Sequence, residues 1–376
     1  MALLTYQPFK ALYVLAALGI ELLQLPFFIA KYLTQYGRQH PEWSFRQALS
    51  TRLIFAFVYH SASVQAKSPT PLTPGGEKER FVRIKPAASA QYKGPLRISN
   101  DVQPVEIGAT WYPAPLTASA DKSSVKVVLH IHGGAFVMGD GRTQSGGYFA
   151  KLALKHMCAT HVFMPQYRVS TLPASATSNP FPACLQDSLT AYLYLLNDLH
   201  IAPENIVLSG DSAGGNASIS LLRYIAEYGA ELGLENPSAA LLWSPWIDPS
   251  DTSASFVHDN RNYQTDYLSK PFTLWGTSAY AGPGGKAVLS SPYVSHKNRT
   301  FETPVPLFVN TGSGEVLFFD DCEWAEKMKE AGNDVELDVE KNVPHDIAML
   351  ANVLGFHAEA TAMAKRAGKW LSSKRR

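Results

Sequence analysis

The chain has 376 residues, of which 46% are hydrophobic and 17% charged, and its formal net charge at pH 7 is +1. This composition can bury a sizeable core and argues against disorder. The near-zero net charge provides no global field for nucleic acid, so no nucleic-acid partner is expected. The three cysteines lie far apart and form no CxxC pair, which excludes a disulfide framework and a cysteine-based zinc site. Their sparse, odd number suits a reducing compartment.

The N-terminal segment has an ambiguous pattern. Residues 11–30 are apolar except for Glu21 and Gln24, which approaches the ~20 residues that a membrane span needs. The charge of Glu21 and the kink expected at Pro26 both oppose a span. We expect residues 8–36 to form an amphipathic helix that covers the functional site or lies on a membrane surface, with a true span as a third alternative.

Beyond this segment the pattern changes from helical to alternating. A second amphipathic helix is predicted at Phe45–His60, and a linker rich in proline and glycine follows at 69–76. Apolar runs typical of buried strands then alternate with stretches of helical periodicity, which predicts an α/β fold whose mostly parallel sheet is flanked by helices. Strands are expected at 81–84, 105–112, 125–131, 162–167, 205–209, 239–243, 305–311 and 335–340, and helices at 186–199, 215–228, 321–331 and 351–371.

The chain therefore divides into two predicted parts. Residues 1–75 form a helical cap or membrane-surface segment with its linker, and residues 76–376 form the α/β domain. Within that domain, residues 251–297 are rich in Tyr, Phe, Ser and Pro and interrupt the alternation of strands and helices. We expect an inserted lid there.

Residues 210–214, Gly-Asp-Ser-Ala-Gly, carry the strongest chemical signal. They follow an apolar strand and precede a predicted helix, and the two glycines permit a strained strand-to-helix turn that lifts the Ser212 hydroxyl above the sheet. The alternative is an ordinary turn serine near a helix N-terminus. The strand–turn–helix context favours a nucleophile, with Asp211 as an anchor of the loop.

A His-Gly-Gly sequence follows the strand expected at 125–131. Glycines let the backbone approach a substrate and turn its N–H groups toward one point. We expect the N–H groups of Gly133 and Gly134, with that of Ala213, to form an oxyanion hole. His132 is expected to anchor this loop rather than transfer protons.

A serine nucleophile needs a base, which must lie after the serine in the chain order serine, acid, histidine. Of the eleven histidines, His345 is the best placed, because it follows the strand at 335–340 on a loop. His357 falls within the predicted C-terminal helix and His296 precedes the penultimate strand, so both are interpreted as structural.

Glu315 follows the strand at 305–311 and is the predicted orienting acid, which would hold the imidazole in its productive tautomer. Asp320 and Asp321 compete for this role but stand where a helix N-cap is expected. Asp346 is adjacent to the histidine and cannot easily turn back onto its ring.

Together these residues resemble the hormone-sensitive-lipase-like family of α/β-hydrolases, which carries His-Gly-Gly-Gly before a Gly-Asp-Ser-Ala-Gly-Gly turn. The match at 210–215 is complete, and the segments 167–169, 180–187 and 244–248 are also similar to that family. The resemblance covers about Val105 to Leu371. It implies an α/β-hydrolase fold with a cap formed by the N-terminal helices and an insertion after the sixth strand, so residues 1–65 are expected at the substrate entrance.

The chain departs from the family pattern at three places. Ala135 replaces the third glycine, Glu315 stands where an aspartate is usual, and the loop between Tyr167 and Pro180 is longer. The hydrophobic N-terminus and these departures look most like fungal members, which include steryl-acetate deacetylases and esterases of secondary metabolism. The expected location is accordingly cytoplasmic or at the endoplasmic-reticulum membrane.

The leading functional hypothesis is hydrolysis of a carboxylic ester of a hydrophobic molecule with a small acyl group. One alternative keeps the site but replaces hydrolysis by acyl transfer, lactonisation or condensation. Another is a non-catalytic ligand-binding module, which the retention of Ser212, Glu315 and His345 disfavours. Neither H-E-x-x-H nor a dinucleotide fingerprint is present, so no metal or organic cofactor is expected. No pattern in the chain indicates its oligomeric state.

Overall fold

An eight-stranded sheet forms the centre of the molecule in the computed structural model, which describes residues 2–97, 102–117, 121–253, 256 and 259–374. The strand order is β1-β2-β4-β3-β5-β6-β7-β8, with β2 antiparallel to both of its neighbours and all later pairs parallel. The strands are β1 (Phe81–Ile84), β2 (Ile107–Tyr112), β3 (Val127–Ile131), β4 (His161–Gln166), β5 (Ile206–Asp211), β6 (Ala239–Trp243), β7 (Leu307–Gly312) and β8 (Val335–Glu340). The predicted α/β fold and all eight predicted strands are confirmed, with shifts of one or two residues at their ends.

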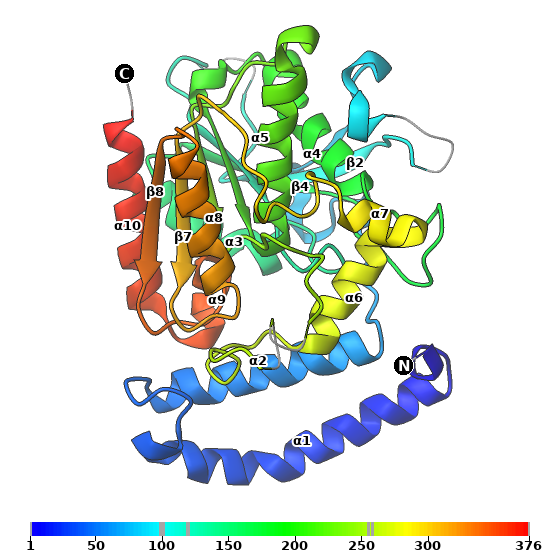
Figure 1. The fold of residues 1–376 in the computed structure, drawn as a ribbon, viewed down its shortest axis with the longest axis vertical. Helices are drawn as coiled ribbons and strands as arrows, with labels where there is room; N and C mark the ends of the chain where they lie inside the picture. Colours follow the sequence, from blue (N-terminus) through cyan, green and yellow to red (C-terminus); the bar gives the residue numbers. More distant parts are fainter. Residues whose placement is uncertain (1, 98–101, 118–120, 254–255, 257–258, 375–376) are drawn as a thin grey trace.

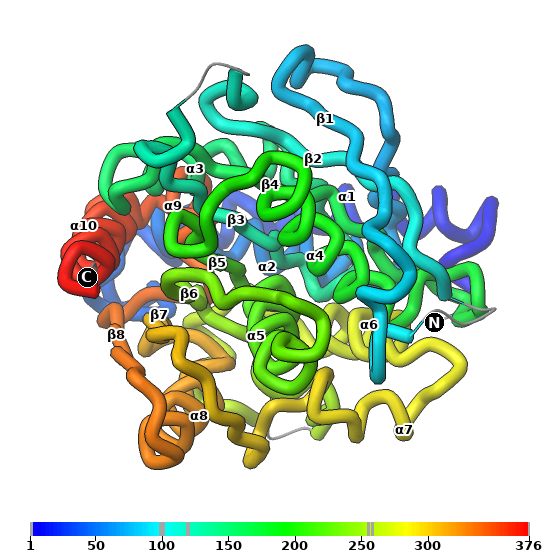
Figure 2. Tube along the Cα trace, turned by 90° about the horizontal axis from the view of Figure 1, so that it is seen from above, coloured from blue at the N-terminus to red at the C-terminus, as the bar shows by residue number. Residues whose placement is uncertain are grey.

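Helices cover both faces of this sheet. In Figure 2, α3 (Thr143–His156) and α10 (His357–Ser373) lie on one face, and α4 (Ala183–Leu193), α5 (Ser212–Leu232) and α8 (Phe318–Glu330) lie on the other. Every residue of β2, β3, β6 and β7 is buried, because helices shield both sides of these strands. The apolar runs of the sequence therefore lie in the centre of the core.

The helix predicted at 351–371 is two helices, α9 (Ile347–Leu354) and α10. Gly355, with φ +90°, ends α9 in the left-handed conformation that favours glycine. The helix predicted at 186–199 begins earlier, as α4, and continues into a π-helical turn over Tyr194–Asp198. Helix α3 was not predicted, because Gly146 and Gly147 lower its intrinsic propensity.

The N-terminal segment forms two helices, α1 (Phe9–Leu33) and α2 (Phe45–Ser63), that lie across one end of the α/β domain (Figure 1). Helix α2 begins with a capping box between Ser44 and Gln47, and it packs on α9 and on α6 (Lys270–Ala281). Trp43, just before α2, donates a hydrogen bond from Nε1 to the carbonyl of Asn342 at 2.5 Å. This contact fastens the cap to the loop that follows β8.

Helix α1 is the outermost layer and packs on α2. Two of its polar side chains face inward: Glu21 pairs with Arg52 of α2 at 2.9 Å, and the hydroxyl of Tyr13 lies 2.8 Å from Nδ1 of His60. Most of its large apolar side chains are exposed. By length and composition α1 could cross a membrane, and it is almost entirely unburied. Glu21 and Tyr13 of this amphipathic helix thus contact α2.

The segment between β6 and β7 contains α6 and the short helix α7 (Gly285–Leu289). It lies between the α/β domain and α2, and α2 packs directly on α6. This places it where an insertion can cover the ends of β6 and β7. Residues 254–255 and 257–258 of the expected lid lie outside the described residues.

Candidate active site

Ser212 lies at the junction of β5 and α5, at the carboxyl edge of the sheet. Its φ is +50°, a left-handed conformation that costs a non-glycine residue about 1–2 kcal/mol. The turn is packed so tightly that a Cβ on Gly210 would lie 2.2 Å from the Gly214 carbonyl oxygen, and one on Gly214 would lie 1.9 Å from that of Ile131. Both flanking glycines are therefore required by close backbone contact. The strained turn is the geometry that exposes a nucleophile in this context.

Glu315 and His345 meet at the same edge. Nδ1 of His345 lies 2.7 Å from Oε2 of Glu315, and both side chains are buried. They come from the loops after β7 and β8, which are neighbouring parallel strands, so their carboxyl ends lie side by side. The other carboxylate oxygen of Glu315 accepts the Gly312 N–H at 2.7 Å and the Thr311 hydroxyl. His345 lines the same pocket as Ser212, so the structure brings the predicted nucleophile, base and acid together.

The electrostatics around His345 favour its protonated form. Burial alone would lower the pKa of this imidazole, but the hydrogen bond and charge of Glu315, with the charge of Asp266, outweigh it and raise the pKa above 6.5. Because Glu315 occupies Nδ1, Nε2 is the ring nitrogen left for proton transfer. This arrangement suits a general base that becomes an imidazolium during the reaction.

The competing carboxyl groups have other partners. Asp320 pairs with Lys297 at 2.8 Å, and Asp321 lies 2.8 Å from the Thr311 hydroxyl, on the side of Glu315 that faces away from His345. Both lie within the first turn of α8 rather than at its N-cap, which is Leu317, so their predicted capping position is wrong by three or four residues. Asp346 instead caps α9, where it accepts the Met349 N–H at 3.3 Å.

Two histidines interpreted as structural occupy different surroundings. His296 is fully buried, and burial lowers its pKa to about 3. Its Nε2 lies 3.2 Å from the Asn216 carbonyl oxygen. His357 begins α10 and stacks edge-on against Tyr148 in the wall of the pocket that contains Ser212. It therefore lies within a C-terminal helix, as predicted, and also beside the substrate space.

The structure corrects the predicted oxyanion donors at one position. The Gly133 N–H donates to Oδ1 of Asp211 at 2.8 Å, so it is not free to bind a substrate oxygen. Within the described part of the chain, no group accepts a hydrogen bond from the N–H of Gly134, Ala135 or Ala213. Gly134 and Ala135 both have positive φ, +98° and +52°. We therefore assign the third donor to Ala135 in place of Gly133.

Buried contacts hold this loop in place. The His132 ring stacks on Tyr167 with centroids 4.1 Å apart, and the Tyr167 hydroxyl donates to the carbonyls of His132 and Gly133 at 3.0 and 3.3 Å. Oδ1 of Asp211 also lies 3.0 Å from Nε2 of His130. His132 and Asp211 thus occupy the anchoring positions expected of them.

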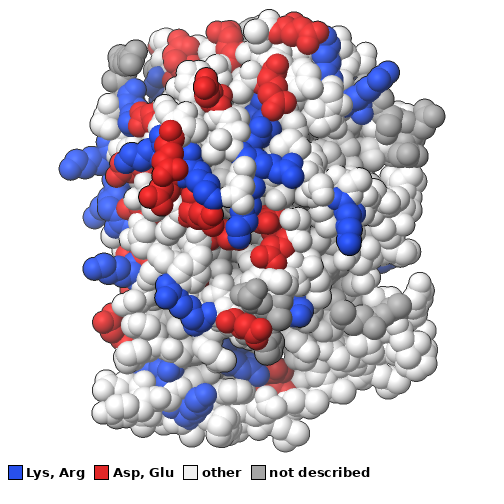
Figure 3. Space-filling view, in the orientation of Figure 1, with Lys and Arg blue, Asp and Glu red and all other residues white. Residues whose placement is uncertain are grey.

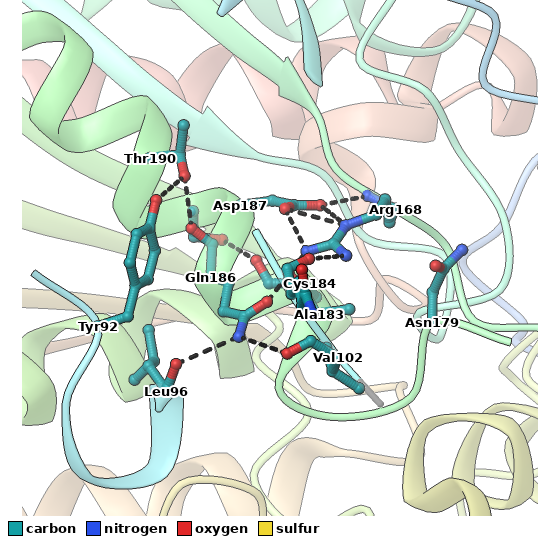
Figure 4. Close-up of polar contacts among 12 residues, drawn as sticks. Tyr92, Leu96, Val102, Arg168, Asn179, Ala183, Cys184, Gln186, Asp187 and Thr190 are labelled. Carbon is teal, nitrogen blue, oxygen red and sulfur yellow. Dashed lines mark hydrogen bonds and ion pairs between the residues drawn. The ribbon is translucent and has the colours of Figure 1, made fainter. Parts of the chain in front are cut away.

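Tyr167 is itself fixed by an ion pair one residue further on. Figure 4 shows the Arg168 guanidinium facing Asp187 of α4, with Nη2 2.7 Å from Oδ1 and Nε 2.9 Å from Oδ2. The Arg168 N–H also donates to Asp187 at 2.8 Å, and Nη2 reaches Gln186 at 3.1 Å. A bidentate, backbone-supported pair of this kind holds the Tyr167 loop rigidly against the sheet.

Two cavities adjoin Ser212. The larger, about 700 Å³, opens between the α/β domain and α2, whose Ile54, Phe57 and Val58 form part of its mainly apolar wall. The smaller, about 10 Å³, lies behind Ser212 and is lined by Ala135, Trp246, Leu268, Phe272, Thr273 and Leu317. Helix α2 therefore lines the entrance, as expected of the N-terminal segment, whereas α1 contributes no lining residue. Among the described residues, no group of three or more His, Cys, Asp and Glu could hold a metal ion.

Comparison with known proteins agrees with this geometry. A family model described as the alpha/beta hydrolase fold matches residues 128–349, so the chain belongs to the α/β-hydrolase fold family. Similar proteins include an acetyl-hydrolase of Streptomyces hygroscopicus, 29% identical over 56% of this chain and 64% of that protein. Steryl acetyl hydrolase 1 of Saccharomyces cerevisiae is 21% identical over 64% of this chain and 57% of that protein. The chain thus spans less than two thirds of the length of these relatives.

Solved structures show the same architecture. A crystal structure of an esterase from the bacterial hormone-sensitive lipase family superposes with a TM-score of 0.59 at 24% identity, covering 93% of this chain and 98% of that one. A bacterial heroin esterase gives a TM-score of 0.58 at 20% identity, covering 81% and 87%. These similarities show the fold. The predicted α/β-hydrolase family is confirmed, and the placement among fungal members stays a prediction.

Proposed function

We propose that this protein hydrolyses carboxylic esters of hydrophobic small molecules through an acyl-enzyme on Ser212. The observation that carries the proposal is the 2.7 Å contact between Glu315 Oε2 and Nδ1 of His345, a residue that lines the same pocket as Ser212. Names of similar proteins, an acetyl-hydrolase and an esterase among them, support the same reaction class.

The geometry defines the steps. Nε2 of His345 takes the Ser212 proton as Oγ attacks the ester carbonyl, and Glu315 stabilises the resulting imidazolium. The carbonyl oxygen becomes an oxyanion held by the N–H groups of Gly134, Ala135 and Ala213, each worth about 2.7–4 kcal/mol. The imidazolium then protonates the leaving alcohol. A water activated by His345 attacks the acyl-enzyme and releases the acid, which restores Ser212.

The sizes of the two cavities suggest which part of the substrate each one binds. About 10 Å³ is the space that one water-sized group occupies, so the cavity behind Ser212 suits the methyl group of an acetyl ester. The apolar cavity of about 700 Å³ has room for a larger alcohol part. This assignment agrees with relatives named for acetyl hydrolysis, including one named for steryl acetyl hydrolysis.

A panel of p-nitrophenyl esters of increasing acyl length tests the proposal. We expect the acetate to give the highest kcat/KM and Ser212→Ala and His345→Ala to lose turnover on every ester. Full turnover by Ser212→Ala would refute the hydrolase assignment. Product analysis in the presence of added alcohols separates hydrolysis from acyl transfer, because transfer forms a new ester and hydrolysis releases the free acid.

We also propose that α1 lies on a membrane surface. Its outward residues are strongly exposed for apolar side chains, with Leu15 at 66%, Leu23 at 83% and Phe27 at 64%. In Figure 3 the charged side chains gather over the α/β domain, while the band over α1 is thinly charged. Because α2 separates α1 from the pocket and lines that pocket, a membrane against α1 would bring a lipid-dissolved ester close to its entrance.

A further inference from the structure

Asp266 occupies an unusual place for a carboxyl group. It belongs to the segment between β6 and β7, is 3% exposed, and accepts hydrogen bonds from three backbone N–H groups. Oδ2 accepts the Val316 N–H at 2.7 Å, and Oδ1 accepts the N–H groups of Tyr267 and His345 at 2.7 and 3.1 Å. Two of these donors lie on other loops: Val316 directly follows Glu315, and His345 is the base itself.

The residues just before Asp266 bind the acid loop as well. Asn262 Nδ2 donates to the carbonyls of Ser313 and Glu315 at 3.1 and 2.9 Å, and the Thr265 hydroxyl donates to that of Gly314 at 2.7 Å. Residues 262–266 therefore lie along the loop that carries the acid. The side chain of Asp266 also reaches the loop of the base.

We propose that Asp266 is a positioning residue that holds the loops of Glu315 and His345 at their working distance and adds a second negative charge beside the imidazole. The inference rests on the proposed hydrolase function and deepens it. It makes the insertion part of the catalytic apparatus, since a movement of residues 262–266 would shift the acid and the base together. The neighbouring Tyr267 and Leu268 line the substrate cavities, so substrate contact and triad geometry share one segment.

Charged groups lie around Asp266 and its neighbour Tyr267. The charges of His345, from the loop after β8, and Glu315, from the loop after β7, act on Asp266, and those of Asp346 and Asp211 act on Tyr267. Burial and the charge of Glu315 raise the pKa of Asp266 to about 6, against the attraction of His345 and the two N–H donors from the loops. Above that pH both oxygens accept as an anion. Below it, a proton occupies one of them and weakens the link between the loops.

The test compares Asp266→Asn, Asp266→Ala and the control Asp251→Asn, which makes the same acid-to-amide change in the same segment. Asp251 accepts the Ser253 N–H, which is a local hydrogen bond. In p-nitrophenyl acetate hydrolysis we expect Asp266→Asn to lower kcat on the order of tenfold to a hundredfold, with KM changed less than about twofold. Asp266→Ala should lose at least as much, and the control should match wild type.

The pH dependence of activity distinguishes two roles for Asp266: a positioning residue that also supplies a negative charge, and a residue that is only structural. Without the Asp266 charge the imidazolium is less stabilised, so the pKa of His345 falls and the acid limb of kcat/KM moves to lower pH. NMR titration of the labelled His345 ring measures the same shift without any substrate. A wild-type kcat in Asp266→Asn, or an unmoved His345 titration, would overturn the proposal. Failure of wild type to cleave esters would instead refute the proposed function and leave the NMR result to decide the role of Asp266.

Discussion

Thr311 Oγ1 lies 2.8 Å from Oδ2 of the buried Asp321 and also contacts Oε1 of Glu315. A hydroxyl group carries one proton and can donate to only one of the two carboxyl groups, so the other must donate to it. Burial and the charge of Glu315 raise the pKa of Asp321 well above its ordinary value. Asp321 is therefore the neutral acid: it donates to Thr311, Thr311 donates to Glu315, and Glu315 remains the anion that faces His345.

This series of hydrogen bonds predicts different effects on activity for two substitutions of Asp321. Asp321→Asn keeps a donor toward Thr311, so its kcat/KM should stay within about twofold of wild type. Asp321→Leu removes the donor and frees Thr311 to turn, and we expect an approximately tenfold loss, in line with one hydrogen bond. Ester hydrolysis measured with both variants tests whether Asp321 acts as a neutral hydrogen-bond donor. Equal losses in the two would show that Asp321 acts as a charge.

Replacement of Glu315 should be more damaging. Glu315→Gln keeps the size of the side chain but allows the wrong imidazole tautomer, which we expect to lower kcat by about 10⁴-fold. It also removes the charge that raises the pKa of His345, so the acid limb of the remaining activity should move to lower pH. A pH profile of single-turnover acylation measures both effects. Asp320→Gln, at a neighbouring carboxyl group outside the triad, is the control.

Ser212, Glu315 and His345 could be predicted because each follows a strand of the sheet, and neighbouring parallel strands place their carboxyl ends at one edge. The donor role of Gly133 was predicted wrongly because residue type does not show where an N–H points; its bond to Asp211 is a long-range contact. Asp266 could not be predicted, since it lies in an insertion without periodicity and acts through backbone groups far along the chain.

The oxyanion loop offers a matched pair of substitutions. Ala135→Gly relieves a residue at φ +52° and keeps its N–H, so activity should stay within about twofold of wild type. Gly134→Ala would place a Cβ 2.4 Å from the Met138 carbonyl oxygen at φ +98°, which must move the loop. We expect a loss of about 10²–10³-fold in kcat, the cost of misplacing a donor. Acylation rates of the two variants test whether the backbone of residues 134–135 holds the oxyanion.

Asp346 should make stability depend on pH. Its carboxyl group is buried and hydrogen-bonded to that of Asp211, and burial together with the Asp211 charge raises its pKa well above 3.8. A raised folded-state pKa stabilises the protein fully below the unfolded value, and this contribution is lost as pH rises toward the folded value. Asp346→Asn mimics the protonated form and can still cap α9. Urea unfolding should therefore show a smaller decline toward alkaline pH in Asp346→Asn than in wild type.

The exposed face of α1 gives the last prediction. Wild-type protein should float with phosphatidylcholine vesicles, because the outward side chains gain free energy on leaving water. Replacing Leu15, Leu23 and Phe27 together by Gln should weaken vesicle binding about a hundredfold, if each side chain contributes about 1 kcal/mol on shallow insertion. The control replaces Leu337 and Val339 of β8, which are less exposed at 37% and 39%, by Gln.

The same samples separate the other arrangements of α1. Release by alkaline carbonate indicates a surface helix, whereas resistance indicates a span, which would require the ion pair between Glu21 and Arg52 to break. If wild type is a dimer in solution and the triple variant a monomer, with neither binding vesicles, α1 binds a second copy instead and the membrane proposal is wrong. Retained activity on soluble p-nitrophenyl acetate in the triple variant, with loss on vesicle-dissolved esters, would tie α1 to substrate delivery rather than to chemistry at Ser212.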